Sequence, residues 1–518
     1  MDVSLMDSSV RDGGNVNDWN FGKGTINGIL TNLINSRIEY IELGYLKNCE
    51  YDEDKTLYNT VEEAKRNIPN HCSRDTEFSL MVQEDKWNWD NLEKCDGIIK
   101  NIRVSFHKTD IKEGMELCKR VMEAGYTCHC NPINIMGYTD KELIELVEQI
   151  NILKPAVFTI VDTFGSMSID DIQRINCLLN SNLNKKIKIS VHLHENLGLA
   201  FALAIEFISY FWGKRDIIVD ASLYGIGRIP GNLCIELIAR YLNNERGKNY
   251  CIDYLYDAVD DYITEIKKSN PWGYELAYAL SAFYNLHRTY PEFLIQKGRL
   301  KTKDIRCILE RIVPEHRVIY DREYIEKLYR EYMNVAVDDS ESIAKFKRIT
   351  NEKHVVLIAP GASIKKYKND IIHKAREKDA FIISVNFVVD FIDPDCVFYT
   401  STKRFAQRKN DDKITYIAVT SNLRDYFDGK QMVFDYNNIT SYGQDMICED
   451  SVLMVIHLLS ECNPKTISVA GFDYIMGENR HYDISMEIGE SKPDIENRKD
   501  IFERFQSLNI ELMNHSIN

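Results

Sequence analysis

The stretch Ile187–Asn196, with the sequence IKISVHLHEN, indicates the fold of the first half of the chain. Its β-branched and apolar residues predict a strand, and two histidines stand at alternate positions where the strand ends. Side chains two positions apart on a strand point to the same side, so His192 and His194 can both reach one ligand. In parallel barrels, functional groups stand at the carboxyl ends of the strands. We therefore interpret this stretch as a barrel strand that ends in a functional site.

Seven further β-rich runs flank this strand along the chain. The eight expected strands cover residues 3–7, 40–44, 77–82, 102–107, 127–134, 157–163, 187–194 and 217–223. Amphipathic helical segments such as 110–124 and 140–153 lie between them. Eight strands, each followed by a helix, are typical of a (β/α)8 TIM barrel. An open doubly wound sheet is the alternative, but the eight regular repeats favour the barrel.

The sequence changes character after the barrel. Residues 266–335 are helical and rich in aromatic residues, and we expect them to form a helical annex. Residues 336–351 are polar and are predicted to be a linker. Alternation of strands and helices then resumes over 352–518, which predicts a Rossmann-like parallel-sheet domain. The predicted chain is thus an α/β protein with a barrel at 1–265, an annex, a linker and a second domain.

Composition excludes several classes of function. The 518 residues carry a net charge of −15, which argues against a nucleic-acid-binding surface. No run approaches the roughly 18 uninterrupted apolar residues of a membrane span. The 13 cysteines are scattered without paired CxxC clusters, as expected of reduced cysteines in a cytoplasmic protein. We therefore expect a soluble, cytoplasmic protein of several domains that forms a homo-oligomer.

Polar motifs also follow the first and last barrel strands. Strand one leads into Arg11 and Asp12 in SSVRDGG, and strand eight leads into GIGRIPGN, which ends at Asn232. Asp12 adds an anionic oxygen to the two imidazoles, and Asn232 can add a carbonyl oxygen. Two nitrogen and two oxygen ligands suit Mn²⁺, Mg²⁺ or Zn²⁺, and the residue types do not choose among them.

These three motifs, in this order, resemble those of the aldolase/HMG-CoA-lyase superfamily. IELGYL, IRVSFHK and DTFGSM, within the same residues 1–265, are also similar to that group. The annex is similar to that of 4-hydroxy-2-oxovalerate aldolases and of related aldolases from polysaccharide gene clusters. The resemblance implies a metal bound by the aspartate and the two histidines, with Asn232 as an additional ligand. It also implies that Arg11 stabilises an enolate, although Arg11 could instead be a structural partner of Asp7.

One departure concerns the catalytic base. The 4-hydroxy-2-oxovalerate aldolases carry a base histidine shortly after RDG, and here Asn15 stands near that place. Proton transfer then falls to water or to another group. The candidates are His107 after strand four, His287 and Tyr290 in the annex, and Glu42 on strand two.

The second domain carries its own polar motif. APGAS, at Ala359–Ser363, follows an apolar strand and opens a helix, so Gly361 and Ser363 can present backbone N–H groups to an anion. Polar residues at later strand ends predict a ligand crevice. Residues 354–512 resemble bacterial sialyltransferases that use a CMP-linked sugar. The resemblance implies a cytidine nucleotide pocket lined by Asn386, Thr400, Ser441, Asp473 and Tyr482, with Thr400 replacing an asparagine. Glu490 stands where those enzymes carry a base histidine.

The favoured hypothesis is a metal-dependent aldolase or lyase that joins or cleaves a 2-oxo acid of the pyruvate type and an aldehyde. Its expected setting is modified-sugar or surface-polysaccharide biosynthesis. An acetyl-CoA-dependent Claisen acyltransferase of the same superfamily is the first alternative. The second alternative is a degenerate barrel attached to a nucleotide-sugar glycosyltransferase or to a structural, oligomerising domain.

Overall fold

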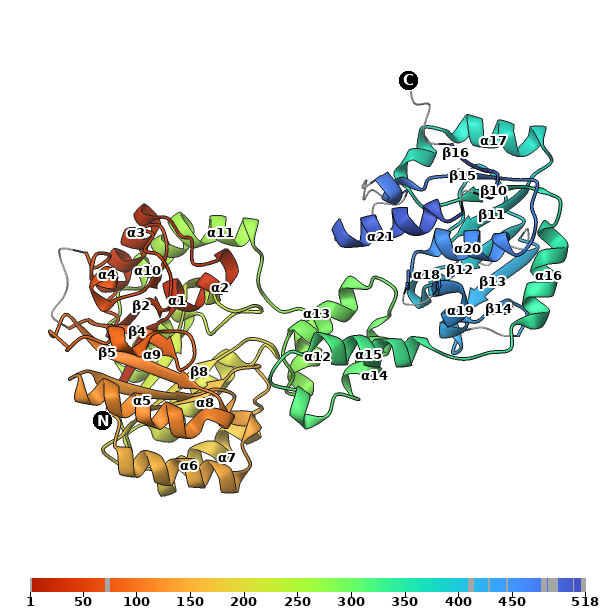
Figure 1. Cartoon of the computed structure of the whole chain (residues 1–518). Coiled ribbons are helices and arrows are strands. Elements are labelled where there is room, and N and C mark those ends of the chain that lie inside the picture. The colour runs from red at the N-terminus through yellow and green to blue at the C-terminus, as the bar shows by residue number, and fades with distance from the viewer. Residues whose placement is uncertain are drawn as a thin grey trace. The chain divides into compact units, whose positions relative to one another are not determined.

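Figure 1 shows the computed structural model of the chain, which describes residues 2–69, 75–408, 414–426, 429–443, 446–476, 482, 492–505 and 507–513. The chain divides into two units, Met1–Arg288 and Thr289–Asn518. The first unit contains the predicted barrel together with residues 266–288 of the predicted annex. The rest of the annex, the predicted linker and the predicted second domain form the second unit.

The first unit is built on a closed parallel sheet. Its eight strands are β1 (Val3–Asp7), β2 (Tyr40–Leu46), β4 (Glu77–Gln83), β5 (Ile99–Phe106), β6 (Thr127–Pro132), β7 (Val157–Asp162), β8 (Lys188–Leu193) and β9 (Ile217–Ala221). Neighbours pair in parallel in the order β1-β9-β8-β7-β6-β5-β4-β2, and β1 also pairs with β2, which closes the barrel. A two-residue strand, β3 (Leu57–Tyr58), lies beside β2. The structure therefore confirms the predicted TIM barrel.

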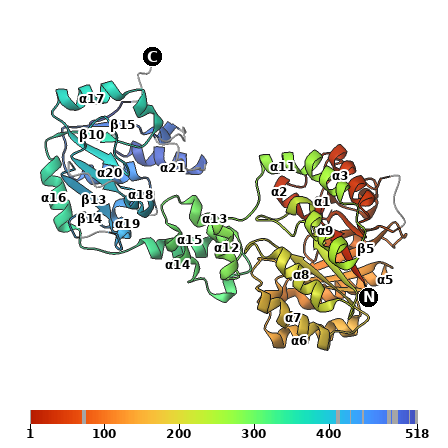
Figure 2. The same ribbon diagram turned by 180° about the vertical axis from the view of Figure 1, so that it is seen from behind.

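The helices of the first unit lie mostly around the outside of the strands (Figures 1 and 2). They are α1 (Ser9–Asp12), α2 (Gly14–Asn17), α3 (Lys23–Asn35), α4 (Val61–Lys65), α5 (Ile111–Glu123), α6 (Asp140–Leu153), α7 (Ile169–Asn182), α8 (Ala200–Phe211), α9 (Ile235–Arg246), α10 (Ile252–Ala258), α11 (Thr264–Ser269) and α12 (Leu276–Phe283). Local sequence fixes several starts. Thr60, Thr139 and Ser168 each form a capping box with an acidic residue three positions later, which satisfies backbone N–H groups at the first turn.

The second unit contains a seven-stranded, all-parallel sheet. Its strands are β10 (His354–Ile358), β11 (Phe381–Val385), β12 (Cys396–Tyr399), β13 (Tyr416–Thr420), β14 (Met432–Phe434), β15 (Thr466–Ala470) and β16 (Ile510–Leu512). They lie in the order β14-β13-β12-β11-β10-β15-β16. The chain thus winds outward in one direction from β10 and then in the other, so the strand order reverses beside β10. The parallel sheet of the prediction is confirmed, and the Rossmann-like assignment stays a prediction.

The helices of the second unit include those expected in the annex. They are α13 (Thr289–Gln296), α14 (Thr302–Leu309), α15 (Arg322–Met333), α16 (Ser340–Thr350), α17 (Lys368–Glu377), α18 (Thr402–Ala406), α19 (Tyr436–Thr440), α20 (Ser451–Ser460) and α21 (Lys492–Glu503). The structure differs from the prediction at 336–351, where α16 takes the place of a linker. Phe346 and Ile349, one helical turn apart, are buried, and Val433 donates its N–H to Ser342 Oγ at 3.0 Å. The polar composition of the segment concealed this apolar stripe.

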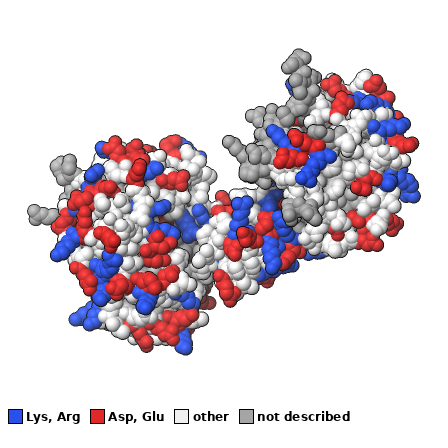
Figure 3. All heavy atoms as spheres, viewed as in Figure 1, with Lys and Arg blue, Asp and Glu red and all other residues white. Residues whose placement is uncertain are grey.

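The surface carries both signs of charge. Figure 3 shows Lys and Arg interspersed with Asp and Glu on the viewed face, without a large basic patch among the coloured side chains. Within the described ranges, we find no helix with the length and hydropathy that crossing a bilayer requires.

Candidate functional site

Three buried side chains meet at the carboxyl ends of β1 and β8, which are separated by β9. Asp12 ends the short helix that follows β1, His192 lies on β8, and His194 follows that strand directly. Asp12 Oδ2 lies 4.0 Å from His192 Nε2 and 3.9 Å from His194 Nε2. One ligand atom from each residue lies within 4.8 Å of the other two. This spacing lets the three side chains share one metal ion.

Contacts behind the imidazoles orient both rings. His194 Nδ1 lies 2.9 Å from the carbonyl oxygen of Asp162. Because a carbonyl only accepts, Nδ1 donates, and the lone pair of His194 is on Nε2. His192 Nδ1 lies 3.3 Å from the buried carboxylate of Asp220, which favours the same tautomer. Both Nε2 atoms face Asp12. His194 is held in the form that binds a metal by the kind of carbonyl partner typical of metal-binding histidines, and the Asp220 carboxylate lies close behind His192.

The electrostatics keep the group ready for a cation. Burial by itself raises the pKa of Asp12, but the charge of Arg11, both imidazoles and a hydrogen bond from Asn232 hold that pKa well below its usual range. Burial and the neighbouring His192 lower the pKa of His194 to about 3. At neutral pH the site thus presents an ionised carboxylate and a neutral His194, which are the protonation states of metal ligands.

Asn232 completes the donor set. Its Nδ2 donates to Asp12 Oδ2 at 2.8 Å, whereas its Oδ1 is buried and has no hydrogen-bond partner among the described residues. A buried carbonyl oxygen without a partner is costly, and a cation would satisfy it. Gly227 leaves the space, since a Cβ there would lie 2.3 Å from Asn232 Nδ2 and 2.7 Å from Asp12 Oδ2. Two imidazoles and two oxygens therefore fit a divalent metal.

A chain of alternating buried charges continues from the site through the barrel interior. Arg11 contacts Asp12 Oδ1 through Nη1 at 2.5 Å and Glu42 Oε2 through Nε at 2.7 Å. Glu42 Oε2 also accepts from Arg103 Nη1 at 3.1 Å, and Arg103 Nη2 pairs with Asp220. Asp220 is the residue behind His192, so the network closes on the metal-binding group.

This network bears on two alternatives that the sequence left open. Arg11 pairs with Glu42 and Asp12, whereas Asp7 accepts from the backbone N–H and hydroxyl of Ser9 at 2.9 and 2.6 Å. Glu42, a candidate base, is held between two guanidinium groups and serves to position Arg11. Sequence reasoning missed Arg103 and Asp220. The available signal was a single charged residue inside an otherwise apolar strand, in IRVSF and in IIVDA.

The two candidate histidines occupy different environments within the first unit. His287 Nε2 lies 2.9 Å from Arg228 Nη2, which can only donate, so the imidazole accepts there. Burial and the charges of Arg228 and Arg288 lower the pKa of His287 to about 3. His107 follows β5, with Nε2 3.3 Å from Gln83 Nε2, and burial lowers its pKa.

Glu84 directly follows β4, and His107 directly follows β5, the neighbouring strand, so the two residues lie at adjacent strand ends. Burial raises the pKa of Glu84 to about 7, despite a hydrogen bond from the backbone of His107. Its Oε2 has no hydrogen-bond partner among the described residues. Sequence reasoning missed this residue, because a glutamate after a strand carries no signal of its burial.

Tyr290 belongs to the second unit rather than to the barrel unit. It is fully buried, and its hydroxyl lies 2.6 Å from the carbonyl of His316 and 3.1 Å from that of Ile319. The same oxygen accepts from the backbone N–H of Asp321 at 3.1 Å. These contacts hold the loop before α15 in place, and the catalytic role of Tyr290 stays a prediction.

The predicted anion loop of the second unit is satisfied internally. Gly361 N–H donates to the carbonyl of Gly471 at 2.9 Å. Ser363 donates its N–H and its hydroxyl to the two carboxylate oxygens of Asp473, at 2.8 and 2.5 Å. These four residues join the segments that follow β10 and β15 at the reversal of strand order, and the N–H groups of Gly361 and Ser363 are not presented to a ligand.

The other residues of the predicted nucleotide pocket have the following contacts, and their role stays a prediction. Asn386 and Thr400 are in contact, since Thr400 N–H donates to Asn386 Oδ1 at 2.9 Å. Ser441 donates to the carbonyl of Asn437 at 2.7 Å and is exposed, and Tyr482 donates to Asp390 Oδ1 at 2.8 Å. Glu490 lies outside the described residues.

Comparisons with known proteins bear on the barrel. Residues 2–260 match the model of the HMGL-like family. A 4-hydroxy-2-oxovalerate aldolase of Thermomicrobium roseum is 35% identical over 114 residues, which cover 22% of this chain and 30% of that protein. Another from Pseudoalteromonas translucida is 26% identical over 157 residues, or 27% of this chain and 44% of that protein. The matched stretch thus spans less than half of either curated relative.

Among solved structures, the N-terminal domain of a candidate aldolase from Bacteroides vulgatus is 22% identical, with a TM-score of 0.49 over 57% of this chain and 96% of that one. The resemblance of residues 354–512 to sialyltransferases is not confirmed and stays a prediction. The resemblance of residues 1–265 is confirmed at the level of the family, because the family model matches half of the chain. The chain belongs to the HMGL-like family.

Proposed function

We propose that the first unit is a divalent-metal-dependent carbon–carbon lyase or aldolase that acts on a 2-oxo acid of the pyruvate type. The observation that carries this proposal is the buried group of Asp12, His192 and His194 beside the guanidinium of Arg11. Membership of the HMGL-like family and the 4-hydroxy-2-oxovalerate aldolases among its relatives support the same class of reaction. The aldehyde partner and the setting in modified-sugar or polysaccharide biosynthesis stay predictions.

The metal is held by Asp12, His192, His194 and Asn232 in this proposal. When bound, a divalent ion supplies Lewis acidity to the carboxylate and keto oxygens of the substrate. The residues of the chain prepare that role by fixing both imidazoles from behind and by keeping Asp12 ionised. Every ligand-bearing segment sits at the carboxyl ends of adjoining strands, so the barrel sets the geometry before substrate arrives.

Arg11 stabilises negative charge next to this group. Cleavage of the bond beside a carbonyl leaves an enolate, and a cation already oriented toward that oxygen lowers the barrier without reorganisation. The contacts of Arg11 with Glu42 and Asp12 use Nε and Nη1. Its third nitrogen, Nη2, is therefore the one that we assign to the substrate.

Proton transfer is assigned to Glu84 and His107, on adjacent strand ends. A carboxyl group whose pKa is about 7 exchanges protons efficiently near neutral pH, and this is the value to which burial raises Glu84. His107 contacts Gln83 and provides a backbone hydrogen bond to Glu84. Glu84→Gln should lower kcat while leaving the bound metal unchanged, and unchanged kcat would remove Glu84 from this role.

The deciding experiment combines metal content with turnover. The full chain is treated with EDTA and reloaded with Mn²⁺, Mg²⁺ or Zn²⁺. Pyruvate release from 4-hydroxy-2-oxo acids is then followed, along with condensation of pyruvate with short aldehydes. His194→Ala should lose bound metal and activity together, whereas His373→Ala, at an exposed histidine of α17, should lose neither. Activity that survives EDTA or His194→Ala would refute the proposal.

A further inference from the structure

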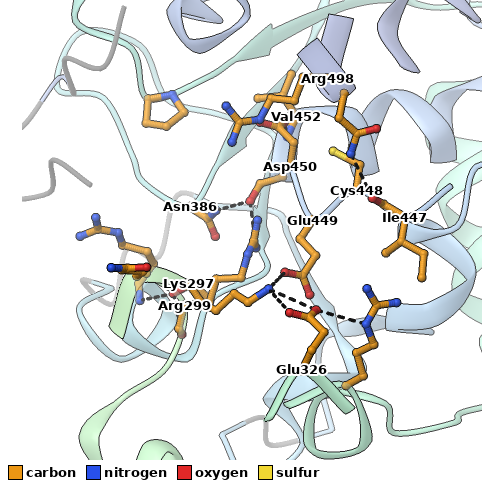
Figure 4. Close-up of a pocket in the computed structure, with 18 of the residues that line it drawn as sticks. Lys297, Arg299, Glu326, Asn386, Ile447, Cys448, Glu449, Asp450, Val452 and Arg498 are labelled. Atoms are coloured by element: carbon orange, nitrogen blue, oxygen red, sulfur yellow. Dashed lines mark hydrogen bonds and ion pairs between the residues drawn. The ribbon is translucent and has the colours of Figure 1, made fainter. Parts of the chain in front are cut away.

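The second unit contains a cavity of about 700 Å³ that the proposed barrel chemistry does not use. It opens at the carboxyl ends of the strands, where Pro360 follows β10, Asn386 follows β11 and Ser401 follows β12. The N-terminus of α20, the segment between α13 and α14, and parts of α15 and α21 line its other sides (Figure 4). A cavity of this size accommodates a small molecule, and the carboxyl edge of a parallel sheet is where such ligands bind.

The lining has an excess of positive charge. Six of its residues are Lys or Arg and four are Asp or Glu, which leaves two positive charges uncompensated. Figure 4 shows Lys297 between Glu326 and Glu449, and its Nζ lies 3.1 and 3.9 Å from their carboxylates. Arg498 pairs with Asp450 at 3.1 Å. Glu326, Glu449 and Asp450, three of the four acidic residues of the lining, therefore each pair with Lys297 or Arg498.

Arg299 has no such partner. Its Nη1 donates to the hydroxyls of Thr400 and Ser451 at 2.9 and 3.4 Å, and no carboxylate of the described residues lies within ion-pair distance of it. Glu449 and Asp450 attract the guanidinium from beyond ion-pair distance, and both also accept hydrogen bonds from other groups. Glu449 accepts from Tyr436 and Tyr329 at 2.8 and 3.2 Å, and Asp450 Oδ1 caps the first N–H groups of α20. A guanidinium that meets only neutral hydroxyls in a lined cavity favours an anion.

A polar cluster holds this guanidinium in place. Asn386 donates to Ser451 Oγ at 2.9 Å and to Thr400 Oγ1 at 3.2 Å, and the two hydroxyls lie 2.6 Å apart. Asn386 adopts a left-handed backbone conformation with φ of 63°, which costs free energy in a residue other than glycine. Ser401 and Thr402 also donate to the carbonyl of Arg299, at 3.1 and 3.0 Å. The position of Arg299 is therefore set by the sheet edge before any ligand binds.

We propose that this cavity binds a small molecule through an oxyanion group, a phosphate or a carboxylate, with Arg299 as its principal contact. The fork of Arg299 can donate two parallel hydrogen bonds to either anion. This inference goes beyond the activity proposed for the barrel and does not depend on it.

The test uses calorimetric titration of the full chain with matched charged and neutral probes. CMP with cytidine as its uncharged control, and inorganic phosphate, examine the phosphate source. Glucuronate with glucose as its control examines the carboxylate source. At least one anion should bind, and its uncharged control should bind at least about tenfold more weakly, because hydrogen bonds to charged groups are the stronger ones.

Two variants assign the binding to Arg299. Arg299→Gln should weaken the anion that binds by about tenfold or more. Lys327→Gln, which removes an exposed cation of α15 outside the cavity lining, should leave affinity unchanged. If Arg299→Gln does not fold, Arg299→Lys serves instead, and it should still bind more weakly because an ammonium lacks the planar fork. The absence of heat from every anion, or equal affinity in the Arg299 variant and the wild type, would overturn the proposal.

Discussion

Replacing Glu42 with glutamine tests the buried charge network most directly. Glu42 is fully buried and meets Arg11 at 2.7 Å and Arg103 at 3.1 Å. At an effective dielectric constant of about 20, each contact contributes on the order of 4 kcal/mol of attraction, much of which offsets the cost of removing the charges from water. Breaking such a buried pair destabilises proteins by about 3–5 kcal/mol. Because the positioning of Arg11 and Asp12 also depends on Glu42, metal affinity should fall about 10–100-fold.

The assay combines thermal unfolding of the metal-free chain with calorimetric titration of metal. A loss of 3–5 kcal/mol in the free energy of unfolding corresponds to a Tm of the barrel that is lower by about 6–20 °C. The matched control is Glu62→Gln, because Glu62 lies on the surface and pairs with Lys65 alone among the described residues, and exposed pairs contribute at most about 1 kcal/mol. If Glu42→Gln has the same Tm as the Glu62→Gln control and binds metal as tightly as the wild type, the role given to this network is refuted.

Three further predictions concern single positions. Gly227→Ala should lower metal affinity at least about tenfold with the barrel still folded, because its Cβ would meet Asn232 and Asp12; unchanged metal content in mass spectrometry would contradict this. Tyr290→Phe should destabilise the second unit by about 1–3 kcal/mol in urea unfolding without altering lyase activity, and a loss of activity would support its catalytic assignment. Burial lowers the pKa of His129 to about 3 from an unfolded value of 6.5, so the unfolded chain binds the extra proton between these values. Stability should be complete above pH 6.5 and fall by up to about 1.4 kcal/mol per pH unit as the pH drops toward 3, and His129→Gln should flatten this slope.

The sequence predicted the barrel well because each strand is a short run of β-branched and apolar residues that can be recognised without knowledge of the rest of the chain. The first strand was placed at 3–7, as β1 is, and the other seven were located with shifted ends. The metal-binding candidates could be found for a related reason, since each stands beside a strand end. What could not be predicted depends on contacts between distant segments. Arg103 and Asp220 are 117 positions apart, and nothing in either strand reveals their pairing.

In the second unit too, contacts between segments that are distant in the sequence limited what could be predicted. The APGAS loop carried the expected pattern for anion binding, but Gly471 and Asp473, more than 100 positions later, take up the N–H groups of Gly361 and Ser363. Conversely, Arg299 gave no signal, because it lies in a segment that was expected to belong with the barrel as an annex. The functional interpretation of Arg299 depends on its contacts with the residues at the carboxyl edge of the sheet.

The contacts of Arg299 also determine where this chain can be divided for study. A fragment that starts at residue 352 would retain the whole parallel sheet and yet lose the guanidinium that the edge of the sheet holds. Asp304 would be lost as well, so Thr402, which donates to its carboxylate at 2.9 Å, would lose this acceptor. Such a fragment would expose a surface that α14 and α15 normally cover. A fragment that begins at Thr289 keeps this unit intact, so the helices before the sheet should be expressed in the same fragment as the sheet.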